Sequence, residues 1–281
     1  SVRKYLRQFL TDGRVIPINP VLRYLLVNLI IAPFRAGKSF KLYRKLWTEE
    51  GSPLLVNGKK LKEKLQRSLN ENYEVLLAMN YGNPALTDIL KDIKAKPFNK
   101  IIVVPLFPQY ASSTTGSVIE KTLKTIRNWN NIPEIKIIGA FYNNQGFIQA
   151  FSEKISQAGI TENVHVLFSF HGLPVKQVCQ SHPESSCEEK KCIHGINPDN
   201  HFCYQAACYE TASLIARNTG IPQNKYTICF QSRFSSNWLN PFTEDIIVQK
   251  AKEGIKKLVV VCPSFVADCL ETLVEVGHEY H

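Results

Sequence analysis

The chain has 281 residues, of which 44% are hydrophobic and 21% are charged, so it can bury one large or two smaller cores and is too apolar for a disordered chain. No apolar run reaches the about 20 residues that a transmembrane helix needs, and no secretory signal opens the sequence. Because it does not begin with Met, we expect a processed or trimmed product.

The net charge of +10 comes entirely from residues 1–67, which hold 15 Lys or Arg against 4 Asp or Glu. Apolar residues such as Leu25, Leu29 and Phe34 lie among these charges, which argues against a nucleic-acid arm. The mixture favours a membrane surface or an apolar ligand that carries carboxylates. A solvated basic face over a core helix is the alternative.

Short β-branched runs alternate with amphipathic stretches along the rest of the chain. In chain order they predict a helix over 56–71, a strand over 75–79, a helix over 84–94, a strand over 100–107, a helix over 116–129, a strand over 135–140, a helix over 144–157, a strand over 164–170, a helix over 204–218, a strand over 226–231, a helix over 243–253, a strand over 257–262 and a helix over 266–277. Nearly continuous apolar strands between helices are typical of parallel sheets covered on both faces, so the class is α/β. We place a domain boundary near residue 150, which gives the halves 1–150 and 151–281.

Unusual residues follow the predicted strands, where ligands bind in open α/β sheets. His171 comes directly after the strand over 164–170, and the next residue is Gly172, which lets a ligand or another backbone approach closely. A neutral imidazole there can take a proton or bind a first-row metal. The alternative is a structural histidine that bonds a loop carbonyl. Neither a complete P-loop nor a G-x-G-x-x-G motif occurs, so no nucleotide site is predicted.

Four ionisable residues are spaced 3, 4 and 3 apart in the last predicted helix, which puts them on one stripe: Asp268, Glu271, Glu275 and His278. Such a stripe suits the guidance of a divalent cation or the transfer of protons. An ordinary amphipathic surface helix has the same periodicity. The stripe follows the strand-end Cys262, where an α/β crevice is expected.

Five of the eight cysteines fall within residues 179–208, namely Cys179, Cys187, Cys192, Cys203 and Cys208. Disulfides are a poor explanation without a secretory signal, and no C-x2-C pair points to a zinc ribbon. The segment is polar and has no periodicity, so it needs something to hold it together. An iron–sulfur cluster is favoured, and zinc or free thiols are the alternatives.

Motifs in order along almost the whole chain resemble the ferrochelatase family. The matching stretches are Arg3-Lys4-Tyr5-Leu6-Arg7, Trp47-Thr48-Glu49-Glu50-Gly51-Ser52-Pro53, Pro105-Leu106-Phe107-Pro108-Gln109-Tyr110, Ser113-Thr114-Thr115-Gly116-Ser117, Ser169-Phe170-His171-Gly172, Phe230-Gln231-Ser232-Arg233-Phe234, and Cys262-Pro263 through Asp268-Cys269-Leu270-Glu271-Thr272-Leu273. The resemblance implies two Rossmann-like, chelatase-type halves, each a parallel sheet flanked by helices, with a porphyrin cleft between them. The sequence departs from the family pattern at Asn80, where many relatives have Arg, and at Cys269, where some have a second His.

The resemblance also implies roles for individual residues. His171 and Glu271 would be catalytic, and Asp268 and Glu275 would extend an acidic path for the substrate iron. The residues implied to contact the porphyrin or shape its cleft are Tyr81, Ser113, Gln231, Ser232 and Arg233. Some relatives hold a [2Fe–2S] cluster, for which the implied ligands are Cys179, Cys187, Cys192 and Cys203, with Cys208 in reserve.

The implied activity is the insertion of Fe²⁺ into a dicarboxylic porphyrin, protoporphyrin IX, to form haem with release of two protons. Coproporphyrin is the alternative porphyrin substrate. The alternatives are a cobalt or nickel chelatase of another tetrapyrrole and a non-enzymatic iron–sulfur or haem-binding sensor. We expect porphyrin and ferrous iron as partners, no nucleic acid, a cytoplasmic location with peripheral membrane contact, and a monomer or a homodimer.

Overall fold

The computed structural model describes residues 2–160, 163–182 and 184–280, with the side chains of residues 36, 38 and 39 left out. The chain forms two compact units, which we describe separately. The first unit consists of Ser1–Pro105, Ser112–Gly139 and Ala267–Val274, and the second of Leu106–Ala111, Ala140–Val266 and Glu275–His281. The domain boundary near residue 150 stays a prediction.

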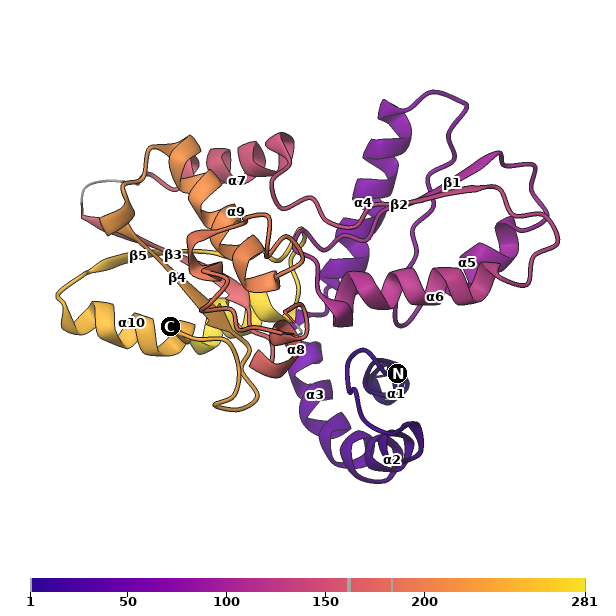
Figure 1. Cartoon of the computed structure of the whole chain (residues 1–281), viewed down its shortest axis with the longest axis horizontal. Coiled ribbons are helices and arrows are strands. Elements are labelled where there is room, and N and C mark those ends of the chain that lie inside the picture. Colours follow the sequence, from indigo (N-terminus) through magenta and orange to yellow (C-terminus); the bar gives the residue numbers. More distant parts are fainter. Residues whose placement is uncertain (1, 161–162, 183, 281) are drawn as a thin grey trace. The chain divides into compact units, whose positions relative to one another are not determined.

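The first unit contains a two-stranded parallel sheet with helices around it (Figure 1). Its elements are α1 (Val2–Leu10), α2 (Pro20–Leu25), the π-helix η1 (Leu26–Ile31), α3 (Ala32–Leu46), α4 (Pro53–Ser68), α5 (Leu86–Ile93), β1 (Lys100–Val103), the π-helix η2 (Ser112–Gly116), α6 (Ser117–Ile126) and β2 (Glu134–Ile137). Strand β1 pairs with β2 from Lys100 opposite Glu134 to Val103 opposite Ile137. Helix α4 begins after Ser52, whose hydroxyl accepts a hydrogen bond from the N–H of Leu55.

The basic amino-terminal region, for which no helix was predicted, forms α1, α2, η1 and α3. Large apolar side chains on α2, η1 and α3 lie exposed, with Phe34 at 78% and Leu29 at 65% of full exposure. Among the described residues no single helix is long and apolar enough to cross a bilayer, although the bent pair Pro20–Arg35 and Phe40–Leu46 together meets the length and composition requirement.

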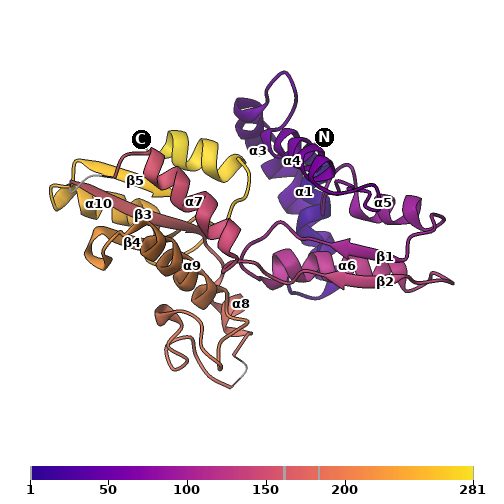
Figure 2. The same ribbon diagram turned by 90° about the horizontal axis from the view of Figure 1, so that it is seen from above.

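The second unit is built on a three-stranded parallel sheet of order β4-β3-β5. Its elements are α7 (Gln145–Gln157), β3 (Val164–His171), α8 (Val175–Cys179), the 3₁₀ turn η3 (Cys192–His194), α9 (Tyr204–Thr219), the 3₁₀ turn η4 (Gln223–Lys225), β4 (Tyr226–Gln231), α10 (Thr243–Lys252) and β5 (Lys257–Val261). Helices α7 and α9 lie on one face of this sheet and α10 on the other (Figures 1 and 2). The α/β class with parallel sheets flanked by helices is confirmed.

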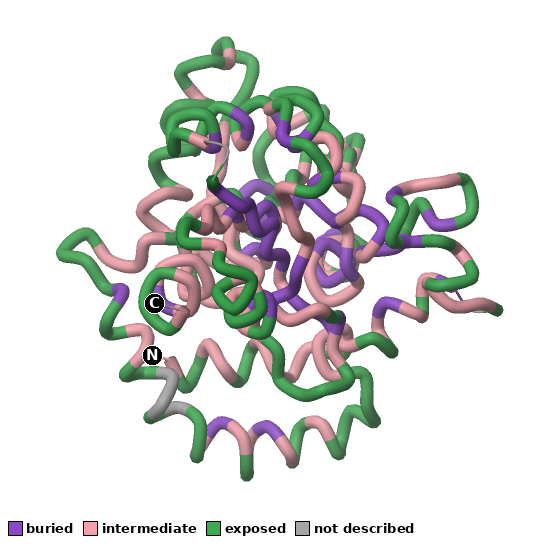
Figure 3. Tube along the Cα trace, turned by 90° about the vertical axis from the view of Figure 1, so that its left-hand side faces the viewer, coloured by how far each residue is buried: buried purple, intermediate pink, exposed green. Residues whose placement is uncertain are grey.

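Strand β3 is the centre of this core because both of its faces are covered. Residues 164–170 are all buried, and Figure 3 marks buried positions in purple along the trace. Phe168 and Phe170 pack in the cluster that includes α7 and α9, while Leu167 packs against Ile246 of α10. Alternate side chains of a strand point to opposite faces, so an uninterrupted apolar run is needed here. Only the last residue, His171, emerges from this burial.

Two predicted elements are wrong. Residues 75–79 form no strand: Val75 donates its N–H to the side chain of Gln66, and Met79 makes only an isolated bridge with Ala85. The last helix is not an α-helix over 266–277 but a π-helix, η5 (Glu271–Glu279). Its hydrogen bonds span five residues, as from the N–H of Tyr280 to the carbonyl of Glu275, so α-helical spacing no longer applies.

Candidate active site and candidate metal centre

His171 lies at the carboxyl end of β3 in the second unit, where the sequence predicts it. Its Nδ1 lies 2.6 Å from the carbonyl oxygen of Gly172, and its ring packs beside Trp238 and Phe265. A carbonyl oxygen only accepts hydrogen bonds, so the proton belongs on Nδ1 and the lone pair on Nε2. The hydroxyl of Tyr204 donates to the His171 carbonyl at 2.8 Å and fixes the backbone below the ring. The imidazole is thus held in the tautomer that accepts a proton at Nε2.

Gly172 allows the chain after His171 to run directly against strand β4. Its N–H donates to the carbonyl oxygen of Gln231 at 2.8 Å, and a Cβ at this position would lie 2.8 Å from that same oxygen. Because the obstructing atom belongs to the backbone, it cannot rotate away. Glycine is therefore required at position 172, because any side chain there would collide with the carbonyl oxygen of Gln231.

We expect Gly172→Ala to lower the free energy of unfolding by about 1–3 kcal/mol and to reduce activity, because the added methyl group forces β3 and β4 apart below the His171 ring. Urea unfolding and steady-state kinetics check this. Gly139→Ala is the matched control, since a Cβ there meets no atom within 4 Å. Equal stability and activity of the two variants would contradict the expectation.

Glu275 is held by side chains at the end of β4 in the second unit. Its carboxylate accepts hydrogen bonds from the Ser232 N–H at 2.6 Å, the Ser232 hydroxyl, the Tyr280 hydroxyl at 2.8 Å and the Gln231 amide at 3.4 Å. Ser232 adopts a positive φ of 62°, which aims its N–H at the carboxylate. These residues line a pocket of about 190 Å³. Glu275, predicted for the acidic path, thus lies beside Gln231 and Ser232, predicted for the cleft, and is an anchored hydrogen-bond acceptor.

Arg233, which the resemblance implies shapes the porphyrin cleft, is engaged by its own unit. Its guanidinium forms an ion pair with Glu244, lies 4.0 Å from Asp245 and stacks 4.3 Å from the centre of the Phe242 ring. These contacts fix the side chain beside the Glu275 pocket.

Glu271 and Asp268 lie in the first unit, whereas Glu275 and His278 belong to the second, so the single stripe of four predicted from helical spacing is wrong. Asp268 precedes the π-helix, is exposed and accepts a hydrogen bond from Thr272 at 3.2 Å. The physical reason is the late start and wider turn of η5.

Two tyrosines of the amino-terminal helices surround Glu271. Tyr5 of α1 and Tyr43 of α3 pack edge to face with ring centres 6.1 Å apart, and their hydroxyls are hydrogen-bonded. Burial raises the pKa of Tyr5, and the negative charge of Glu271 raises it further. The pKa of Tyr43 is raised by the same two causes, with Tyr5 adding to them. Burial and the charge of Glu271 likewise raise the pKa of the Cys269 thiol, so Glu271 faces three protonated groups.

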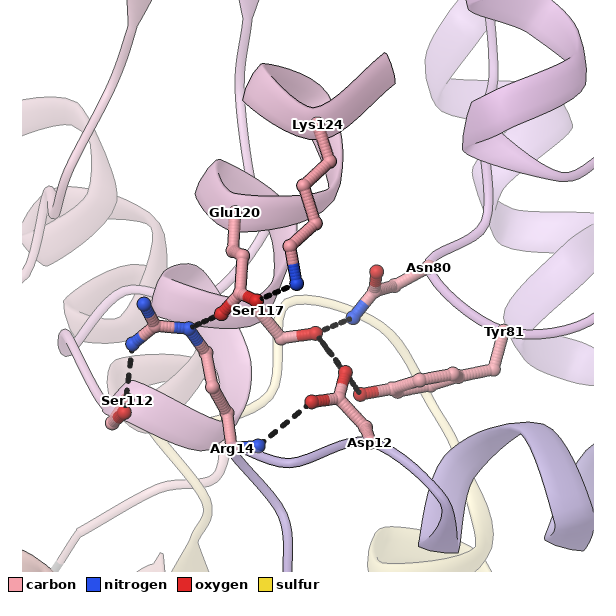
Figure 4. Close-up of polar contacts among 8 residues, drawn as sticks. All are labelled: Asp12, Arg14, Asn80, Tyr81, Ser112, Ser117, Glu120 and Lys124. Carbon is pink, nitrogen blue, oxygen red and sulfur yellow. Dashed lines mark hydrogen bonds and ion pairs between the residues drawn. The ribbon is translucent and has the colours of Figure 1, made fainter. Parts of the chain in front are cut away.

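Tyr81 belongs to a polar network in the first unit (Figure 4). Its hydroxyl donates to Asp12 at 2.8 Å and lies 3.1 Å from the hydroxyl of Ser117, which also donates to Asp12. The ammonium of Lys121 lies 4.3 Å from the centre of the Tyr81 ring. The Tyr81 ring also packs edge to face with Tyr5 and Phe9, at centroid distances of 6.5 Å and 5.3 Å, so ring and hydroxyl are both engaged within this unit.

Ser113 lies half-buried in η2, next to Ser112, whose hydroxyl accepts a hydrogen bond from Arg14 at 3.1 Å. Arg14 is also paired with Glu120 of α6 (Figure 4). The network therefore ties the turn after α1 to η2 and α6, around Tyr81 and Ser113, two of the residues that the resemblance assigns to the porphyrin.

We expect Asp12→Ala to lower the free energy of unfolding by about 1–3 kcal/mol at pH 7, because Ser117 and Tyr81 lose their acceptor. Burial raises the pKa of Asp12, but hydrogen bonds from Ser117, Arg14 and Tyr81 outweigh it and bring the pKa below its usual value. The contribution is present above the unfolded-state pKa of about 3.9 and is lost as the pH falls through the folded-state pKa. Urea unfolding at pH 7 and in acid measures this difference, with the exposed Asp92→Ala as control. A gap between variant and wild type that widens in acid would contradict the assignment.

Four side chains of the cysteine-rich segment converge in the second unit: His182, Cys187, Cys192 and Cys203 offer ligand atoms that all lie within 4.8 Å of one another. The Sγ atoms of Cys187 and Cys203 are 3.8 Å apart, and Nε2 of His182 lies 3.3 Å from Sγ of Cys192. Thiolate and imidazole are ligands of zinc and of iron–sulfur centres. The predicted Cys179 is not a member of this group, and Cys208 is buried in the main core instead.

The chemistry of the thiols suits a metal. A hydrogen bond from Cys187 and another from the Ala206 N–H hold the pKa of Cys203 well below its usual value despite burial. Cys203 is the N-cap residue of α9, where the helix dipole also favours an anion. The side-chain amide of Asn200, which is buried, donates to the carbonyl of Gly195 at 3.0 Å and to Sγ of Cys192 at 3.7 Å, so it braces the loop around the group.

Comparison with known proteins decides the family. The ferrochelatase family model matches residues 1–281. A ferrochelatase of Legionella pneumophila (strain Paris) is 45% identical over 278 residues, which is 99% of this chain and 82% of the relative. A ferrochelatase of Coxiella burnetii (strain Dugway 5J108-111) is 40% identical over 280 residues, 99% of this chain and 78% of the relative.

The chain belongs to the ferrochelatase family. It is therefore a porphyrin metal chelatase that inserts Fe²⁺ into a porphyrin to form haem. The two-domain α/β ferrochelatase fold agrees with the parallel sheets described above.

Several functional candidates of this ferrochelatase were missed in the sequence. Tyr5 and Tyr43 surround Glu271 from more than 200 positions away in the chain, a proximity that no local pattern contains. His182 lies among the cysteines, and counting histidine as a metal ligand type would have found it. Asn200 carries no sequence signal of its own.

Proposed function

We propose that this ferrochelatase metallates the dicarboxylic porphyrin protoporphyrin IX, with His171 as the acceptor of pyrrole protons. The observation that carries the proposal is the hydrogen bond from Nδ1 of His171 to the Gly172 carbonyl, which leaves the Nε2 lone pair as the base. Insertion replaces two N–H bonds of the macrocycle by bonds to Fe²⁺, so two protons leave for each iron that enters. A base fixed in one tautomer at a strand end suits the removal of those protons.

In this proposal Glu271 binds the incoming Fe²⁺. Carboxylate oxygen is a ligand for Fe²⁺, and the acid is half-buried beside Tyr5 and Tyr43, which restricts the water around it. Asp268, exposed and close in the chain, would exchange iron with solvent. Glu275 accepts four hydrogen bonds and is assigned a positioning role for the Gln231–Ser232 turn. The porphyrin cleft between the two units stays a prediction.

The assay that tests this is anaerobic. The full chain is mixed with Fe²⁺ and either protoporphyrin IX or coproporphyrin, and haem formation is followed in the visible bands. We expect a higher kcat/KM for protoporphyrin IX. A preference for coproporphyrin overturns the substrate proposal, and insertion of only Co²⁺ or Ni²⁺ into another tetrapyrrole overturns iron as the metal.

The segment 179–203 is proposed to hold a [2Fe–2S] cluster, with Cys187, Cys192 and Cys203 among its ligands. Their convergence and the lowered pKa of Cys203 support a metal centre, and they are the donor types that iron–sulfur clusters use. When bound, such a cluster supplies structural cross-links to a loop without regular structure and an electron-accepting group. Iron and acid-labile sulfide, measured after anaerobic purification, test the cluster; zinc without sulfide would contradict it.

The exposed apolar face of the first unit is proposed to contact the cytoplasmic surface of a membrane peripherally. Val21, Leu29 and Phe34 are 65–78% exposed, and Lys41 and Arg44 of the same helical region are exposed cations that suit anionic headgroups. Co-sedimentation with vesicles containing anionic lipid is expected, and it should weaken in high salt and in Phe34→Ser. If as much protein sediments with neutral vesicles as with anionic ones, the proposed attraction between the basic residues and anionic headgroups is contradicted.

A further inference from the structure

The candidate metal centre contains one donor that sequence spacing did not assign. Three of its four members are predicted cysteines, and the fourth is His182. Nε2 of His182 lies 3.3 Å from Sγ of Cys192, while Sγ of Cys187 lies 3.8 Å from Sγ of Cys203. The donors thus form two close pairs, and every donor atom lies within 4.8 Å of every other.

The burial of His182 supports a role as a ligand. The residue is only 4% exposed, and its Nδ1 is buried without a hydrogen-bond partner among the described residues. Buried polar groups are normally satisfied, and desolvating an imidazole without compensation is unfavourable. The polar neighbours of its ring are the thiols of Cys192 and Cys203. A metal ion at Nε2 would replace these thiol contacts by a coordination bond, which favours the burial of the ring.

The backbone around His182 explains why Cys179 lies outside the group. The N–H of His182 donates to the carbonyl of Cys179 at 2.8 Å, in the turn that follows α8. This turn carries the chain inward, so the side chain three residues after Cys179 reaches the other thiols. Cys179 keeps a partly exposed thiol at the end of α8.

We propose that His182, and not Cys179, is the fourth protein ligand of this metal centre, beside Cys187, Cys192 and Cys203. The inference rests on the proposed metal centre and specifies its ligand set. A neutral imidazole replaces an anionic thiolate, which lowers the negative charge at the metal. In a [2Fe–2S] cluster this exchange raises the reduction potential, as histidine ligands do in Rieske centres. In a zinc site the same donors make a Cys3His set.

The experiment compares wild type, His182→Ala, Cys179→Ser and His182→Cys, all as the full chain purified anaerobically. Iron, zinc and acid-labile sulfide are quantified, and pulsed EPR of the reduced cluster records coupling to ¹⁴N. We expect full metal content and unchanged spectra in Cys179→Ser, and at least a tenfold loss of metal in His182→Ala. Wild type should show the strong ¹⁴N coupling of a coordinated nitrogen.

His182→Cys separates ligand loss from misfolding. A thiolate at this position restores four ligands, so we expect it to regain metal, to lack the ¹⁴N coupling and to have a lower reduction potential than wild type. If the metal is zinc, X-ray absorption should fit three sulfur atoms and one nitrogen in wild type and four sulfur atoms in His182→Cys.

The outcomes distinguish the two levels of the proposal. Loss of metal in Cys179→Ser together with retention in His182→Ala overturns the histidine ligand and leaves the metal centre in place. A wild-type protein without bound metal overturns both the metal centre and the histidine ligand. The porphyrin substrate proposal is tested separately, by the haem-formation assay.

Discussion

Replacing His171 with alanine is expected to lower kcat for iron insertion by about 10²–10⁴-fold, the usual contribution of a positioned general base. The ring is fixed by the hydrogen bond of Nδ1 to the Gly172 carbonyl and by packing against Trp238 and Phe265. Alanine removes the Nε2 lone pair and leaves the β3 backbone bonds unchanged. Anaerobic stopped-flow or steady-state measurement of haem formation checks the rate.

Control measurements isolate the chemistry from the fold. His171 is the one residue of β3 that is not buried, so its truncation should alter the unfolding midpoint little. His201→Ala is the matched control, because His201 is exposed and its ring lies against the Pro198 carbonyl and Phe202 of its own loop. A folded His171→Ala protein with the full rate of iron insertion would refute the role of His171 as the base.

The core of the second unit could be predicted because its signals are local. The uninterrupted apolar run over 164–170 requires a strand with both faces covered, and the structure extends it by one residue to His171. The neighbouring glycine then indicated close backbone approach, which the 2.8 Å contact with Gln231 bears out. The residue type of His171 and its position at the end of a predicted strand were enough to identify it as a candidate site residue.

The acidic carboxyl-terminal segment shows where periodicity fails. Asp268, Glu271 and Glu275 are spaced for one face of an α-helix, but η5 is a π-helix that begins only at Glu271. The wider turn follows from hydrogen bonds across five residues, which the α-helical period does not describe. Glu271 thereby joins Tyr5 and Tyr43, and Glu275 joins Ser232 in the other unit.

The cysteine-rich loop shows a second limit. The resemblance implied Cys179 as a ligand, but a turn of irregular backbone brings His182, and not Cys179, into the group of converging donors. Positions in such a loop are decided by individual bonds, for example those of Asn200 to the Gly195 carbonyl and to Cys192. No repeating pattern encodes these bonds, so the structure is needed to see them.

Replacing Glu271 with glutamine is expected to lower kcat by at least about 100-fold, with little change in stability. Glutamine keeps the size of the side chain but loses the negative charge that attracts Fe²⁺ and accepts a proton. The charge of Glu271 also helps to raise the pKa values of Tyr5, Tyr43 and Cys269, so the variant should bring the pKa of Cys269 down toward that of an ordinary buried thiol. Haem formation and the pH dependence of thiol alkylation measure the two effects.

The matched control is Glu74→Gln, which removes an acid of the same unit that pairs with Lys96 at 2.8 Å. We expect that control to retain the wild-type rate. Tyr43→Phe tests the surroundings of Glu271 without touching its charge: it should raise KM for Fe²⁺ more than it lowers kcat, because the carboxylate stays but loses an ordered neighbour. If Glu271→Gln keeps the wild-type rate while Asp268→Asn loses it, the metal-side role belongs to Asp268, and the half-buried acid beside the two tyrosines is structural.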